Sequence, residues 1–149
     1  MPTEPRVTAI HVAPGSRLPV RSVESVLVEA GKGLVGDRYH GTKHRHVSVQ
    51  SATSLAEAAE AYGAPIDPAG TRRNVTLSHG EVPRTPGARL RIGNVLLEVV
   101  RVAAPCKLLD DTLGRGAQEA LRGRGGSIFR VLEGGEITVG DAVVPEALA

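Results

Sequence analysis

Cysteine is nearly absent from this 149-residue sequence, which contains Cys106 alone. A single cysteine excludes a disulfide bond within the chain and a zinc site built from several thiolates. Cys106 is therefore either a small buried hydrophobic residue or a reactive thiol.

Aromatic residues are also scarce, with two Tyr, one Phe and no Trp. Proteins that bind single-stranded nucleic acid stack the bases on aromatic side chains, and this chain has few of them. Its 18 Lys and Arg residues are nearly balanced by 16 Asp and Glu residues, so the formal net charge is only +2. The composition therefore predicts no nucleic-acid partner.

A long apolar run is missing as well. No segment approaches the ~20 apolar residues that a membrane-spanning helix needs, and the first residues, MPTEPRVTA, lack the charged and apolar regions of a secretory signal. We therefore expect a cytoplasmic protein with no membrane partner. We also expect one domain over residues 1–149, because the chain is too short for two domains of typical size.

Glycine and proline, in contrast, are frequent, with 18 and 10 residues, and they favour short elements joined by tight turns. Alternating apolar residues predict strands. Further strands are expected on either side of two turns, at Gly93–Asn94 and at Gly134–Gly135. The predicted strands outside these turns cover residues 6–12, 22–29, 46–50 and 71–77. The fold class is thus mainly β with a few helices, a β-barrel or compact sandwich of mixed strands.

The clearest helix is expected over residues 51–63, SATSLAEAAEAYG. Ser51 is a suitable N-cap, alanine and glutamate favour the helical conformation, and Gly63 is a typical terminator. A second, shorter helix is expected over residues 114–122.

The glycine-rich segment GKGLVG, residues 31–36, has the GxGxxG spacing of dinucleotide-binding folds. The residues that follow, DRYHGTKHRH, do not predict the helix that would have to receive the pyrophosphate. A loop shaped by glycines is therefore favoured, although its backbone N–H groups could still bind a phosphate. The motifs of serine hydrolases, P-loop proteins and zinc proteases are absent from the sequence.

Three histidines, His40, His44 and His46, lie within seven residues and raise the possibility of a metal site. Three Lys and Arg side chains in the same segment oppose the binding of a cation. A solvated or anion-facing loop is therefore favoured over a metal site.

Cys106 stands between Pro105 and Lys107 at the end of a predicted strand, with Arg101 nearby in the sequence. A neighbouring cation lowers the pKa of a thiol and favours the thiolate, which attacks electrophiles, carries sulfane sulfur or binds soft metals. The residues alone leave this reading and a buried structural cysteine equally open.

The triplet Arg72-Arg73-Asn74 lies at the entry of the strand predicted over residues 71–77. Adjacent arginines are commonly solvated surface residues. They also bind phosphate through bidentate hydrogen bonds, with an asparagine that orients a neighbouring group. Both interpretations remain open on the sequence pattern alone.

Four segments occur in the order found in the MOSC domain, which is named for the C-terminal part of molybdenum cofactor sulfurases. They are GKGLVGDRYHG (31–41), TRRNVTL (71–77) with GARLRIGNVLLEV (87–99), APCK (104–107) and GSIFRVLEGGEITVGDAV (126–143). The chain therefore resembles a small stand-alone bacterial member of that family.

The resemblance implies a β-barrel and a cleft in which Cys106 faces molybdenum or carries sulfur. It also implies that basic and polar residues line the cleft and bind the anionic molybdopterin. The positions so implied are Gly36, Asp37, Arg38, His40, Arg72, Arg73, Asn74 and Lys107.

Three functions are consistent with this resemblance. The leading hypothesis is a molybdenum-cofactor-binding oxidoreductase that reduces N-hydroxylated compounds, with Cys106 as the molybdenum ligand. The second is a sulfur carrier or sulfur-transfer protein that uses a persulfide on Cys106. The third is a non-catalytic adaptor that binds molybdopterin. The expected partners are a small-molecule substrate and an external electron donor or sulfur-donor protein.

Overall fold

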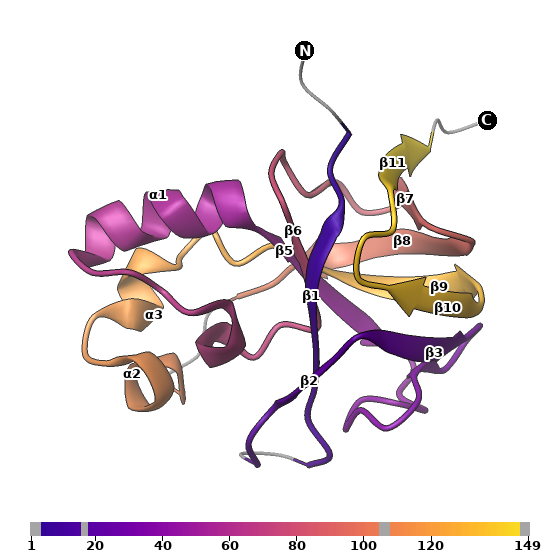
Figure 1. The fold of residues 1–149 in the computed structure, drawn as a ribbon, viewed down its shortest axis with the longest axis horizontal. Helices are drawn as coiled ribbons and strands as arrows, with labels where there is room; N and C mark the ends of the chain where they lie inside the picture. The colour runs from indigo at the N-terminus through magenta and orange to yellow at the C-terminus, as the bar shows by residue number, and fades with distance from the viewer. Residues whose placement is uncertain (1–3, 16–17, 105–107, 147–149) are drawn as a thin grey trace.

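A computed structural model describes residues 4–15, 18–104 and 108–146 of the chain. Figure 1 shows the three α-helices gathered on one side of the molecule and most of the strands on the other. The elements follow one another as β1 (Val7–Val12), β2 (Arg21–Val23), β3 (Ser25–Glu29), β4 (Gly33–Leu34), β5 (Val47–Ser51), α1 (Ala52–Tyr62), η1 (Pro68–Thr71), β6 (Val75–Leu77), β7 (Arg89–Ile92), β8 (Val95–Val102), α2 (Leu108–Leu113), α3 (Ala117–Ala120), β9 (Ser127–Glu133), β10 (Gly135–Thr138) and β11 (Val143–Glu146).

The expectation of a mainly β fold with a few helices is confirmed. Eight strands form one mixed sheet in the order β11-β7-β8-β9-β5-β6-β1-β2, and β10-β3-β4 form a second sheet. The strands β5 and β6 are parallel, and the chain crosses from one to the other through α1 and η1. A crossover of this kind is what a parallel pair requires.

A closed barrel is not formed by the described strands. The large sheet ends at β11 on one side and at β2 on the other. An isolated antiparallel bridge between Arg6 and Ala142 joins the start of β1 to the turn before β11. The expected closure fails because the chain passes between two sheets: β2 pairs with β1, whereas β3 pairs with β10. The strand predicted over 22–29 is thus two strands, divided at Glu24.

The core is aliphatic, as the shortage of aromatic residues requires. Phe129 of β9 is the one aromatic side chain among the buried residues of the strand core. A second, smaller cluster lies beneath the helices, where Leu55 of α1 packs with Leu109 of α2 and Leu121. These two clusters lie on opposite sides of the β1, β5 and β6 strands, and the sheet between them carries the residues discussed below.

Helix α1 confirms the prediction for residues 51–63. Ser51 accepts a hydrogen bond from the Thr53 N–H at 3.2 Å, and Gly63 ends the helix in the left-handed conformation with φ of 89°. Glycine is favoured at this position because it has no Cβ. No helix among the described residues is long and apolar enough to span a bilayer.

The strand predicted over 71–77 begins later than expected. Residues Pro68–Thr71 form the 3₁₀ helix η1, with Asp67 as its N-cap, and only Val75–Leu77 are a strand. Proline at the start of a helix and aspartate before it favour this arrangement. Arg72 then adopts φ of 63°, the one positive φ of a non-glycine residue among those described.

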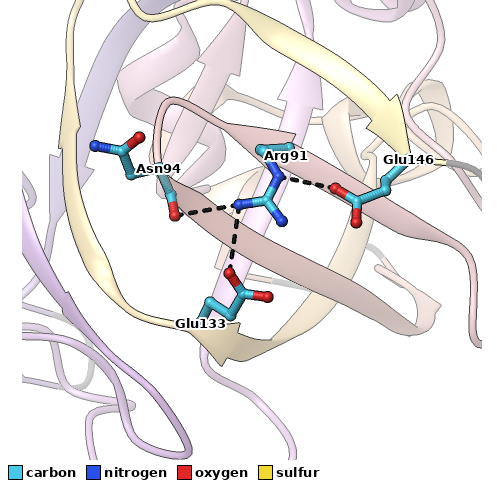
Figure 2. Close-up of polar contacts among 4 residues, drawn as sticks. All are labelled: Arg91, Asn94, Glu133 and Glu146. Atoms are coloured by element: carbon cyan, nitrogen blue, oxygen red, sulfur yellow. Dashed lines mark hydrogen bonds and ion pairs between the residues drawn. The ribbon is translucent and has the colours of Figure 1, made fainter.

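The edge strand β11 is held by Arg91 of β7 (Figure 2). The Arg91 Nε donates to Glu146 Oε2 at 2.8 Å, and its Nη1 donates to Glu133 Oε1 at 3.5 Å and to the Asn94 carbonyl at 3.4 Å. The hydrogen bond from Arg91 lowers the pKa of the Glu146 carboxyl. Because these groups are partly or largely exposed, the contribution of the ion pairs to stability is small.

Gly126 should be indispensable for the packing of the loop between α3 and β9. Its φ is +82°, and a Cβ there would overlap the Val49 carbonyl of β5. We expect Gly126→Ala to lower the free energy of unfolding by more than ~3 kcal/mol, because backbone strain and overlap add. Gly123 is the matched control, since its φ is +75° and a Cβ would meet nothing within 4 Å. Gly123→Ala should cost only about 1–2 kcal/mol. If urea unfolding gave the same loss of free energy of unfolding for Gly126→Ala and Gly123→Ala, the close contact between Gly126 and Val49 would be contradicted.

Candidate functional site

A set of buried polar side chains lies on the sheet face that points away from the strand core. It is named the polar face here and consists of His11, Ser48, Gln50, Asn74 and Thr76. Strand alternation explains it: the neighbours of His11 along β1 belong to the strand core, so His11 points to the opposite side.

Helix η1 covers part of the polar face. Thr71 Oγ1 donates to Gln50 Oε1 at 2.7 Å, and Gln50 Nε2 donates to Thr76 Oγ1 at 2.9 Å. Gln50 Nε2 also lies 3.3 Å from the Pro68 carbonyl. Buried polar groups are stable when they are hydrogen-bonded in this way, so η1 is fixed on the sheet.

Asn74 joins three segments of the chain. Its Nδ2 donates to the His11 carbonyl at 3.1 Å and to Asp37 Oδ1 at 3.3 Å. Its Oδ1 accepts from the Ser48 N–H at 2.9 Å. Asp37 Oδ1 in turn accepts from the Ala13 N–H at 3.0 Å. The structure thus brings together two of the residues implied by the family resemblance, Asp37 and Asn74, and both are buried.

Arg73 is buried, with only 7% of its surface exposed. Its Nε donates to the Gly125 carbonyl at 3.1 Å, and its Nη2 donates to the Ala104 carbonyl at 3.2 Å. These two carbonyls carry no formal charge. Gly125 lies close to the guanidinium, since a Cβ added to this glycine would be 3.4 Å from Arg73 Nη2. A positive charge is therefore held between the 123–126 loop and the end of β8.

Arg72 points elsewhere. Its Nη1 donates to the Leu18 carbonyl at 2.7 Å. The backbone of Arg72 is left-handed, and the two consecutive arginine side chains point in different directions. Arg72 points toward the loop before β2, and Arg73 points toward Ala104. A non-glycine residue in this region is strained, and such strain is often found at functional sites.

Cys106 and Lys107 lie outside the described residues. The nearest described residue before them is Ala104, which accepts the hydrogen bond from Arg73. The carbonyl of Ala104 is thus held by a buried guanidinium.

The other residues implied in the glycine loop, Gly36, Arg38 and His40, have surroundings different from those of Asp37. Gly36 has φ of +90° and is exposed, and Arg38 lies 4.7 Å from the centroid of the Tyr39 ring. His40 Nε2 lies 2.7 Å from Glu29 Oε1 of β3. The structure therefore places His40 beside the smaller sheet and not with Asn74.

The hypothesis of a metal site at the three histidines is not supported among the described residues, where no group of His, Cys, Asp and Glu could hold a metal ion. His46 has both ring nitrogens bound to backbone groups. Its Nδ1 accepts from the Val131 N–H at 3.0 Å, so Nε2 carries the proton and donates to the Thr42 carbonyl at 2.8 Å. His46 is a structural residue that fixes the end of the glycine loop on β9.

His11 was not identified from the sequence. It is 5% exposed, and its Nδ1 is buried without a hydrogen-bond partner among the described residues. Burial lowers the pKa of His11, and the negative charge of Asp67 opposes that shift. The sequence feature that could have indicated a role for His11 was its position as a polar residue within the otherwise largely apolar strand VTAIHV.

The comparisons with known proteins agree with this fold. A family model described as the MOSC domain matches residues 36–144. No functionally curated protein matches the chain.

Solved structures of bacterial proteins have a similar fold. The YuaD protein from Bacillus subtilis superposes with a TM-score of 0.81 at 18% identity, over 95% of this chain and 94% of that one. YiiM from Geobacillus stearothermophilus gives 0.71 at 20% identity, over 96% and 75% of the two chains. YiiM from Escherichia coli gives 0.72 at 15% identity, over 99% and 72%. At these identities the likeness concerns the fold alone.

Replacing Arg73 tests the buried guanidinium. We expect Arg73→Met to lower the free energy of unfolding by about 2–4 kcal/mol, because the buried Gly125 carbonyl and the Ala104 carbonyl both lose a hydrogen bond from a charged donor that is itself buried. Arg84 is the matched control, since it is exposed and donates to the Gly123 carbonyl of the same loop at 3.3 Å. Arg84→Met should cost less than about 1 kcal/mol in the same urea titration. Similar losses for the two variants would show that Arg73 has no special role in stability.

The protonation of His46 should make stability depend on pH. Burial lowers its pKa below the ordinary 6.5, and the charges of Arg130, His44 and His40 act in the same direction. The unfolded chain therefore binds a proton before the folded chain does, so the free energy of unfolding should fall as the pH drops below 6.5 and level off below the folded pKa. His46→Gln should reduce this slope. The free energy of unfolding of each protein is measured relative to its own value at neutral pH. If it falls with pH equally in the wild type and in His46→Gln, His46 is not the source of the pH dependence.

Proposed function

Because this chain belongs to the MOSC domain family, we propose that it is a molybdenum-cofactor-binding oxidoreductase that reduces N-hydroxylated compounds, with Cys106 as the protein ligand to molybdenum. A thiolate suits this role because it is a soft, electron-donating ligand.

The observation that carries the proposal is the hydrogen bond from Arg73 to the Ala104 carbonyl. Ala104 is two residues from Cys106 in the sequence. A buried positive charge beside this backbone favours the thiolate over the thiol, as does the neighbouring Lys107 in the sequence. The same charge favours an anionic ligand.

Arg73 is the described residue that suits an anionic cofactor, because its buried guanidinium is bonded to two uncharged carbonyls. The side chains of the polar face bond mainly to one another and to the backbone, and Nδ1 of His11 is a buried polar atom with no partner among the described residues. In this proposal Arg73 and Lys107 hold the anionic phosphate of the pterin, and Arg72, which donates to the Leu18 carbonyl, does not. When bound, the cofactor supplies two-electron redox chemistry at molybdenum.

Asp37 and Asn74 then have a supporting role. The Asn74 amide is already bonded to His11, Asp37 and Ser48, so it fixes the glycine loop and β1 relative to Arg73. The proposal therefore assigns cofactor binding to Arg73 and Lys107, and positioning to Asp37 and Asn74. His40 is excluded from the cofactor contacts in this proposal, because its ring is paired with Glu29.

The reaction has a simple balance. The N–O bond of the substrate breaks, the nitrogen takes up a proton and becomes an amine or amidine nitrogen, and the oxygen leaves as water after a second proton is added. Two electrons are consumed. Because the GxGxxG segment does not have the context of a dinucleotide site, the proposal requires an external electron donor of the reductase class.

The test is the loss of molybdenum in Cys106→Ser. Wild-type protein expressed with cofactor supply should contain about one molybdenum per chain and reduce an N-hydroxylated amidine with reduced viologen as electron source. Cys106→Ser should lose the metal and the turnover, since a hydroxyl is a poor ligand for a soft site. Arg84→Met is the control and should keep both.

Other outcomes would replace the proposal. Sulfane sulfur on Cys106 without metal would indicate a sulfur carrier, and bound pterin without turnover would indicate an adaptor. Molybdenum retained in Cys106→Ser would exclude Cys106 as its ligand.

A further inference from the structure

A pocket of about 150 Å³ lies between the start of α1 and two loops, residues 81–84 and 123–126. Helix α1 contributes Glu57 to its lining, the 81–84 loop contributes Glu81, and the 123–126 loop contributes Arg124. Gly125, whose carbonyl accepts from Arg73, is not part of the lining. The pocket is thus formed by residues that the proposed function does not use.

Hydrogen bonds hold the walls of this pocket together. Ser51 Oγ donates to the Gly80 carbonyl at 2.6 Å, and the Gly80 N–H donates to Thr53 Oγ1 at 3.1 Å. These bonds fix the 81–84 loop at the start of α1. On its other side the loop is bonded to β9, where Ser127 Oγ donates to the Pro83 carbonyl at 2.7 Å. The walls are therefore preformed, which lowers the entropic cost of binding a ligand.

The size of the pocket limits its ligand. A cavity of about 150 Å³ holds a molecule the size of benzene, which indicates a ligand of roughly six to eight non-hydrogen atoms. Pockets for drug-sized ligands occupy about 300–1,000 Å³, so a pterin or a nucleotide is larger than this pocket. The buried Val82 side chain is part of the lining and suits a short apolar chain in the ligand.

Four charged side chains of both signs surround the pocket without neutralising one another. Glu57 and Glu81 carry the carboxylates, and Arg84 and Arg124 carry the guanidinium groups. In the part of the chain that the structure describes, none of the ion pairs includes any of the four. Both signs of charge are therefore left to solvent or to a ligand.

The two signs are anchored on different sides of the pocket. Arg84 Nη1 donates to the Gly123 carbonyl at 3.3 Å, and Arg124 Nη1 donates to the Ala120 carbonyl at 3.0 Å. Both guanidinium groups are thus held at the segment that follows α3. The carboxylates belong to α1 and to the part of the 81–84 loop that is bonded to its start. A ligand with one positive and one negative end matches this arrangement.

We propose that the pocket binds a small zwitterion, in which an ammonium group and a carboxylate are joined by a short apolar chain. The ammonium group bonds to Glu57 and Glu81. The carboxylate bonds to Arg124, which is half-buried, whereas Arg84 is exposed. Because Nη1 of Arg124 is bonded to Ala120, its Nε and Nη2 are left for a bidentate contact with the carboxylate. The inference is independent of the proposed function, since it involves neither Arg73 nor the cofactor.

A series of ω-amino acids, from glycine to 6-aminohexanoate, serves as the probe. Added to the purified full-length chain at pH 7 and constant ionic strength, the best-binding member should shift the ¹H–¹⁵N resonances of Thr53, Gly123 and Gly126 with a Kd of about 0.1–10 mM. It should bind at least about tenfold more tightly than the amine or the carboxylic acid of the same chain length, because each of these lacks one charge-assisted contact. No saturable shift with any member, or equal affinity for the amine or the acid alone, would overturn the proposal.

Substitutions at the two ends of the pocket separate ligand binding from a general effect on the fold. Arg124→Met should weaken the binding of the zwitterion about three- to tenfold and leave that of the amine unchanged, whereas Glu57→Gln should weaken both and leave that of the acid unchanged. Arg122→Met and Glu60→Gln are the matched controls, since these exposed residues lie on the same segments outside the lining, and both should keep the wild-type affinity. Wild-type affinity for the zwitterion in either pocket variant, or an equal loss in the controls, would show that the proposal is wrong.

Discussion

The side-chain amide of Asn74 is the interaction on which the site depends. Its Nδ2 bonds to the His11 carbonyl and Asp37, and its Oδ1 bonds to Ser48, so one buried side chain joins β1, the glycine loop and β5. Every donor and acceptor of this group is used inside the protein. Because an unsatisfied buried amide would be costly, the three segments are held in a single arrangement, and Arg73 and His11 are held with them.

This arrangement places polar chemistry between two apolar clusters. The strand core includes residues of β1, β5 and β6, and the helices form their own aliphatic cluster, with α1 in contact with β5. Helix η1 covers part of the polar face, where hydrogen bonds and charges are screened less than in water. In the proposed function, the buried guanidinium of Arg73 favours an anionic ligand.

Two features of the sequence could be interpreted only with the structure. The histidine-rich loop raised the possibility of a metal site, although a solvated or anion-facing loop was favoured; in the structure His46 bonds to backbone groups through both ring nitrogens, and His40 pairs with Glu29. The spacing of the histidines could not predict these contacts. Thr42 is close in the sequence, but the other partners, Val131 and Glu29, belong to distant strands. The expected closed barrel is likewise replaced by two sheets, since the short break at Glu24 sends one predicted strand into both of them.

The sequence by itself determined the elements whose signals are local: the alternation of β1, the Gly93–Asn94 turn, and α1 with its caps Ser51 and Gly63. It also determined that Arg73, Asn74 and Asp37 belong to one family pattern. Only the tertiary structure decided that Asp37 and Asn74 bond to each other, that Arg73 reaches Ala104, and that His11 is buried with a sealed Nδ1. The physical reason is that propensity and periodicity act between near neighbours in the chain, whereas the burial and hydrogen-bond partners of a side chain depend on segments that meet only on folding.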